Sequence, residues 1–265
     1  MWRGSCARTD RARGRWRRVH AYTAVVKDWE DLARREPYFA LLNDDGSPDV
    51  KGSANATAAF FEAGEGDIAT LLPAIVSLLG RDVTLDRVLD FGCGAGRLTL
   101  PLARRARNAV ACDIAQTILE HARRNAEQAG LHNVTFIGVE ALAGSGPFDF
   151  ICSLLVFEHI PNKPGYEIIR TLMTLLEPGG VAALHIPFRR PAATLLRLIR
   201  FRSLPENRTR GVIRHVQRRA PDPAERCEYE ERSILRSIAL AGARVVARLP
   251  IHRGHAGGVL IIEKR

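Results

Sequence analysis

The chain has 265 residues, 46% of them hydrophobic, which is enough to bury a full core in one large domain. It holds no run of about 18 apolar residues and no N-terminal apolar stretch, so we expect neither a transmembrane helix nor a secretory signal. Its five cysteines show no CxxC pair and no metal-ligand spacing, so we expect reduced thiols in a soluble, cytoplasmic protein.

The net charge of +10 is concentrated in two segments. Residues 1–20 carry a net charge of +6 and residues 189–219 a net charge of +9, so the rest of the chain has a net charge of −5. Because residues 1–20 lack apolar periodicity, they are expected to form a disordered basic tail. An arm that binds nucleic acid or a membrane surface is the alternative.

Residues 21–84 are expected to form an N-terminal helical cap. The apolar side chains from Phe60 to Leu79 recur near a 3.6-residue period, and Gly80 follows them as a helix stop. This pattern predicts a long amphipathic helix ahead of the main domain.

From residue 85 to the C-terminus at 265, strand and helix patterns alternate. The expected strands are hydrophobic over nearly their whole length and span residues 87–92, 108–114, 133–139, 148–157 and 179–188, with helices over 95–106 and 115–130. Such strands predict a parallel sheet covered on both faces. A helix over 231–242 and strands over 243–250 and 257–264 follow. Because the last two strands are joined by a short loop, the final strand should run antiparallel.

A glycine-rich turn follows the first strand, in the sequence VLDFGCGAGRLTL. Its glycines are Gly92, Gly94 and Gly96, and Arg97 stands where a dinucleotide fingerprint requires its third glycine. Asp90 directly precedes the turn. A carboxylate at this point suits a ligand that bears an ammonium group.

Acidic residues also follow the next two strands. Asp113 ends the second strand, where a carboxylate can accept both hydroxyls of a ribose. Glu140 follows the third strand, where it can accept from an adenine amino group while the backbone near Val139 and Ala141 meets the ring edge. The segment has no GKT or GKS sequence, so nothing in it points to a phosphate.

The chain resembles the class I S-adenosylmethionine-dependent methyltransferases over about residues 85–188. The matching segments are VLDFGCGAGRLTL, ACDIAQTILEHAR, NVTFIGVEAL, FDFICSLLVFEHIPN and LEPGGVAALHIP. The resemblance implies a doubly wound, mostly parallel, seven-stranded Rossmann-like sheet in the order 3-2-1-4-5-7-6, and S-adenosyl-L-methionine as cofactor. It implies these cofactor-binding residues: Asp90, Gly92, Gly94, Gly96, Asp113, Ile114, Val139, Glu140, Ala141 and Ser153.

Transfer of a methyl group from a sulfonium requires the protein to align the acceptor, exclude water and, for a hydroxyl acceptor, remove a proton. His159, in the sequence FEHIP, is the first candidate for this base. The alternative is that Glu158 and His159 form only a local pair and water takes the proton. His185, His252 and His255 are further candidates.

Ubiquinone-precursor O-methyltransferases resemble this segment but carry a further glutamate, linked to metal binding, at the position of Leu155. Glu158 and His159 alone make a poor site for a hard cation. We therefore expect no metal.

The nature of the acceptor depends on an insert at residues 188–227, where segment 192–204 is basic and amphipathic. This insert is expected to be lid-like and the acceptor a small molecule, methylated at oxygen. An anionic or lipid-like acceptor, or contact with a membrane surface, is a second reading of the insert. RNA methylation, using the basic insert and tail, is the main alternative. A third hypothesis is a protein that binds the cofactor without turnover.

Overall fold

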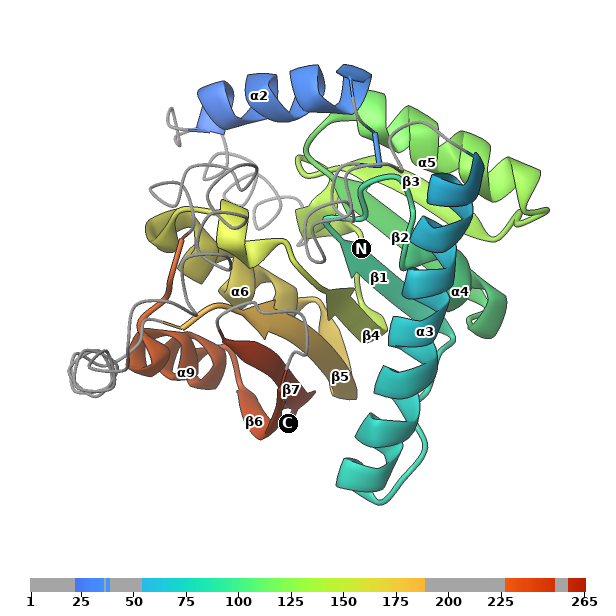
Figure 1. The fold of residues 1–265 in the computed structure, drawn as a ribbon. Coiled ribbons are helices and arrows are strands. Elements are labelled where there is room, and N and C mark those ends of the chain that lie inside the picture. Colours follow the sequence, from blue (N-terminus) through green and yellow to red (C-terminus); the bar gives the residue numbers. More distant parts are fainter. Residues whose placement is uncertain (1–21, 36, 39–53, 189–226, 251–256) are drawn as a thin grey trace, which may run out of the picture.

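Seven strands form one sheet in the order β3-β2-β1-β4-β5-β7-β6 (Figure 1). The computed structural model describes residues 22–35, 37–38, 54–188, 227–250 and 257–265. The strands are β1 (Arg87–Phe91), β2 (Asn108–Asp113), β3 (Val134–Gly138), β4 (Phe148–Ser153), β5 (Leu176–Ile186), β6 (Ala243–Leu249) and β7 (Gly258–Lys264). The pairs among β1 to β5 are parallel, and β7 is antiparallel to both β5 and β6. The expected sheet order and the antiparallel last strand are confirmed.

Helices cover both faces of this sheet, which explains why its strands are hydrophobic over nearly their whole length. The helices are α2 (Tyr22–Arg35), α3 (Ala54–Leu79), α4 (Thr99–Arg105), α5 (Gln116–Gln128), α6 (Asn162–Thr174) and α9 (Glu231–Leu240), with 3-10 turns η2 (Leu142–Gly144) and η3 (Phe157–His159). On one face, Ile68 and Ile75 of α3 join the cluster that contains Val88 and Phe150. On the other face, α6 and α9 pack against the cluster that contains Leu89.

Some element boundaries differ from the predicted ones. Strand β4 ends at Ser153 and does not continue to residue 157, because Leu155 has a positive φ of 63° and residues 157–159 form a 3-10 turn. Helix α4 begins at Thr99, four residues later than predicted, since residues 95–98 still belong to the glycine-rich turn. Helix α3 ends at Leu79, as predicted, and Gly80 follows it with a φ of +64°.

Several expectations concern residues that the structure does not describe. The tail at 1–20, most of the insert at 188–227, and both His252 and His255 lie outside the described residues. The division into tail, helical cap and main domain stays a prediction. Within the described ranges, every helix is too short or too polar to cross a membrane.

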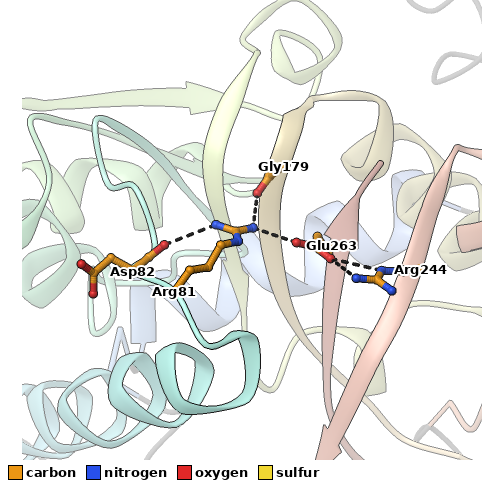
Figure 2. Close-up of polar contacts among 5 residues, drawn as sticks. All are labelled: Arg81, Asp82, Gly179, Arg244 and Glu263. Carbon is orange, nitrogen blue, oxygen red and sulfur yellow. Dashed lines mark hydrogen bonds and ion pairs between the residues drawn. The ribbon is translucent and has the colours of Figure 1, made fainter.

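A charged network connects the end of α3 to the sheet (Figure 2). Arg81 donates from Nη2 to the carbonyl oxygen of Gly179 at 2.7 Å and to Glu263 Oε1 at 2.8 Å. Arg244 donates from Nη2 to the other oxygen of Glu263 at 2.7 Å. Because Gly179 is the fourth residue of β5 and Glu263 is the next-to-last residue of the antiparallel β7, this network lies toward the amino end of the parallel strands. The opposite, carboxyl end is therefore left for a ligand.

Candidate active site

Three carboxylates lie at the carboxyl ends of three adjacent parallel strands. Asp90 lies in β1, Asp113 ends β2, and Glu140 follows β3 by two residues. Asp90 pairs in register with Ala111 of β2 and Asp113 with Gly138 of β3, so the three carboxylates stand at neighbouring strand ends, near the buried thiol of Cys112. Burial raises the pKa of this thiol, and the charges of Asp113, Glu140 and Asp90 raise that pKa further. The fold therefore gathers the three acidic residues around one edge of the sheet.

The glycine-rich turn is tight on one side and open on the other. Gly92 has a φ of +74°, and a Cβ atom added to it would lie 2.7 Å from Val156 Cγ1 and nearer still to Cγ2. Gly94 has a φ of +53°, and no atom of the described chain lies within 4 Å of an added Cβ atom. Close packing accounts for glycine at 92, whereas at 94 the backbone borders open space.

Asp113 connects the two turns that follow β1 and β2. Its Oδ2 accepts from the amide of Gly94 at 2.9 Å, and its Oδ1 accepts from the amides of Ile114 at 2.7 Å and Ala115 at 3.1 Å. Burial raises the pKa of Asp113, although these three hydrogen bonds lower it. An ionised carboxylate has roughly four acceptor sites, so about one remains for a ligand.

Asp90 is buried and accepts a hydrogen bond from Thr99 Oγ1 at 2.6 Å. Burial raises its pKa to about 6, although the hydrogen bond from Thr99 and the charge of Arg97 lower it. The sequence interpretation treated Arg97 only as a missing glycine. In the structure its guanidinium is nearly buried and pairs with Asp67 of α3. The arginine at the third-glycine position was the one sign of this ion pair in the sequence, but its partner lies 30 residues earlier in the chain.

Glu140 is exposed, and its carboxylate lies over the backbone of Gly138. A Cβ atom at position 138 would clash with the whole carboxyl group of Glu140. Ala141 donates from its amide to the carbonyl oxygen of Gly138 at 3.0 Å, which closes a tight turn. Val139 is half-buried and Ala141 is exposed.

Ser153 is the last residue of β4, and His159 ends the 3-10 turn that follows this strand. The Oγ atom of Ser153 is buried and has no hydrogen-bond partner among the described residues. The side chain of His159 is 29% exposed, and its Nε2 lies 3.5 Å from Glu158 Oε1. His159 also donates from its amide to the carbonyl oxygen of Val156, the residue that packs against Gly92. His185 is fully buried in β5.

Comparisons with known proteins show similarity to methyltransferases in sequence and in fold. A family model described as a methyltransferase domain matches residues 88–180, from β1 into β5. A magnesium protoporphyrin IX methyltransferase from Synechocystis with bound SAH aligns with a TM-score of 0.61 and 18% identity, over 92% of this chain and 100% of that one. An amino pentose methyltransferase from Micromonospora echinaspora with bound SAM aligns with a TM-score of 0.55 and 14% identity, over 83% of this chain and 100% of that one.

The segment from β1 to β5 is thus a class I S-adenosylmethionine-dependent methyltransferase domain. Among curated proteins, a ubiquinone biosynthesis O-methyltransferase from Methylocella silvestris is 40% identical over 97 residues, which is 36% of this chain and 37% of the relative. The protein of the same name from Acinetobacter baylyi is 34% identical over 117 residues, which is 43% of this chain and 48% of the relative. The chain spans less than half the length of these relatives.

Proposed function

We propose that this protein transfers a methyl group from S-adenosyl-L-methionine to an oxygen atom of a small-molecule acceptor. The observation that carries the proposal is that Asp90, Asp113 and Glu140 stand at three neighbouring strand ends beside a glycine-rich turn, where Gly94 borders open space. A site with three carboxylates attracts a cationic ligand and disfavours a diphosphate.

The residues present fit the cofactor at several points. The open space at Gly94 would admit the cofactor against the backbone. The remaining acceptor capacity of Asp113 would hold the ribose, and Glu140, with the backbone of Val139 and Ala141, would hold the adenine. The buried Ser153 hydroxyl has no partner in the described part of the chain, and a polar group without a partner costs about 1–3 kcal/mol. A ligand beside Asp90 and Ser153 would remove that cost.

When bound, the cofactor supplies a methyl group on a sulfur that is already an activated leaving group. The chain must align the acceptor oxygen, exclude water and remove one proton from that oxygen. His159 is the residue proposed to take this proton, because it is partly exposed and lies beside the turn. The buried carboxylate of Glu158 would stabilise the imidazolium that forms.

The names of the curated relatives support an oxygen acceptor, since they are O-methyltransferases. They do not extend to the acceptor itself, because each match covers less than half of the relative. A screen of cell-extract fractions with radiolabelled S-adenosylmethionine would identify the methylated metabolite. Binding of the cofactor without any labelled product would favour a protein that binds without turnover.

Isothermal calorimetry with S-adenosylhomocysteine and with NAD tests the cofactor. We expect binding of S-adenosylhomocysteine and none of NAD. An Asp113→Ala variant should bind the homocysteine product at least tenfold more weakly, because the ribose loses a charged partner. Tight binding of NAD with no binding of S-adenosylhomocysteine would defeat the proposal.

RNA methylation is the second candidate, and its support is the basic segments 1–20 and 189–219. Both lie outside the described residues. Contacts with RNA phosphates make affinity fall steeply with salt. RNA affinity that is weak and nearly independent of salt would favour the small-molecule acceptor.

A further inference from the structure

Helix α2 has no role in the function proposed above, yet two of its adjacent residues contact two sides of the site. Figure 1 shows α2 running across the carboxyl end of the strands, from the side of α6 to α5. The ring of Trp29 lies 5.1 Å from the ring of His159, edge to face. Glu30 accepts a hydrogen bond from the amide of Gln116, in α5, at 2.5 Å.

Glu30 completes the N-terminus of α5. This helix has Ala115 at its N-cap, with no side-chain cap of its own. The two oxygens of Glu30 accept from the amides of Gln116 and Thr117, while Asp113 accepts from the amides of Ile114 and Ala115. Four successive amides are therefore satisfied by two carboxylates, one of which is the proposed ribose ligand.

Burial alone would raise the pKa of Glu30, but three hydrogen bonds and one positive charge outweigh this effect, and the pKa is lowered. Hydrogen bonds from the Thr117 side chain and from the amides of Gln116 and Thr117 lower the pKa, with the charge of Arg34 adding to them. Glu30 is therefore held ionised at the helix N-terminus, where a negative charge is favourable.

Trp29 belongs to an apolar cluster that contacts both ligand-binding turns. Its members are Ala33, Phe60, Ala95, Ala115 and Ile118, with Trp29, Tyr38, Phe61 and Ile114 packed against them. Ala95 lies within the glycine-rich turn, and Ala115 follows Asp113. The cluster thus fixes α2 beside the turns, and the rings of Trp29 and His159 meet nearly at right angles.

We propose that Trp29 and Glu30 are positioning residues of the methyl-transfer site, with Glu30 holding the Asp113 turn and Trp29 holding the ring of His159. Helix α2 thereby connects the ribose side of the site to the acceptor side. This inference rests on the proposed function.

The Glu30 contact is tested by calorimetry and by amide hydrogen exchange. Glu30→Ala should weaken S-adenosylhomocysteine by about five- to tenfold and speed exchange at Gln116 and Thr117, because their acceptor is lost. Glu30→Gln, which keeps an acceptor oxygen, should recover part of both effects. Asp31→Asn is the matched control, since it removes one charge from an exposed pair with Arg34 on the same helix.

The Trp29 contact is tested without any cofactor, by the NMR signals of the His159 ring, identified by their loss in His159→Gln. Trp29→Leu should shift and broaden these signals, because the neighbouring ring is removed, and Trp29→Phe should largely retain them. Tyr38→Leu is the control. It removes an aromatic ring from the same cluster, but the rings that Tyr38 contacts are Phe60 and Phe61.

The outcomes separate this inference from the proposed function. Wild-type protein that fails to bind S-adenosylhomocysteine would defeat the function, whatever the NMR signals show. Wild-type protein that binds it, with unchanged affinity in Glu30→Ala and unchanged His159 signals in Trp29→Leu, would overturn the positioning role alone.

Discussion

Val156 packs directly against the backbone of Gly92, so that no side chain fits between them. This contact joins the turn after β1 to the loop after β4. The first turn contains the proposed cofactor cradle, and the second leads into His159. Because residue 92 has no Cβ atom, the turn after β1 and the loop after β4 can approach each other this closely.

Two glycine substitutions should separate this packing from ligand contact. Gly92→Ala is expected to lower the free energy of unfolding by about 2–4 kcal/mol, through strain at positive φ and the clash with Val156. Gly94→Ala should cost only about 1 kcal/mol, because its Cβ atom enters open space. It should nevertheless abolish measurable binding of S-adenosylhomocysteine. Urea denaturation and calorimetry of both variants check this, and full binding by Gly94→Ala would contradict it.

Asp90 should make the ligand-free protein less stable as the pH rises from about 4 to 6. Its pKa is raised from 3.8 to about 6 in the folded state, so the folded protein binds more protons than the unfolded chain in this window. The free energy of unfolding therefore falls as pH rises through the window and levels off above it. Relative to Asp90→Asn, the fall should reach about 2–3 kcal/mol. Urea denaturation at several pH values measures it, and parallel profiles for the two proteins would refute the assignment.

The pair between Asp67 and Arg97 should contribute to stability more than the exposed pairs of the same helix. Asp67→Asn leaves a nearly buried guanidinium without its charged partner, and we expect a loss of about 2 kcal/mol. Glu65→Gln is the control, because Glu65 pairs with Arg104 and Arg105 at a more exposed position, where the loss should be about 0.5 kcal/mol. Thermal unfolding compares the two. Equal losses would show that burial of Arg97 does not matter.

The network around Glu263 should stabilise the fold without affecting the ligand site. Hydrogen bonds from Arg81 and Arg244 lower the pKa of Glu263. Its contribution is therefore fully present above pH 4.5 and is lost as pH falls through the lower folded pKa. Glu263→Gln should cost about 1 kcal/mol at pH 7 and leave the affinity for S-adenosylhomocysteine unchanged. Weakened binding in this variant would show that the two ends of the sheet are coupled.

The local pattern of the chain was sufficient for most of the fold. Runs of hydrophobic residues between amphipathic segments predicted the strands, and the short final connection predicted the antiparallel β7, because no crossover fits into it. The predicted end of β4, at residue 157, was wrong, because residues 154–157 are as apolar as the strand before them. Only the positive φ of Leu155 ends the strand there, and hydrophobicity does not encode it.

The sequence by itself also determined which polar residues stand at the ends of successive strands, because parallel strands bring their carboxyl ends to one edge. Only the tertiary structure decided what those residues bond to. Asp113 uses most of its acceptor capacity on backbone amides, Arg97 pairs with Asp67, and α2 places Trp29 and Glu30 on opposite sides of the site. The contacts of Arg97, Trp29 and Glu30 join residues 30 to more than 100 positions apart, and they depend on how helices dock on the sheet, which spacing along the chain does not record.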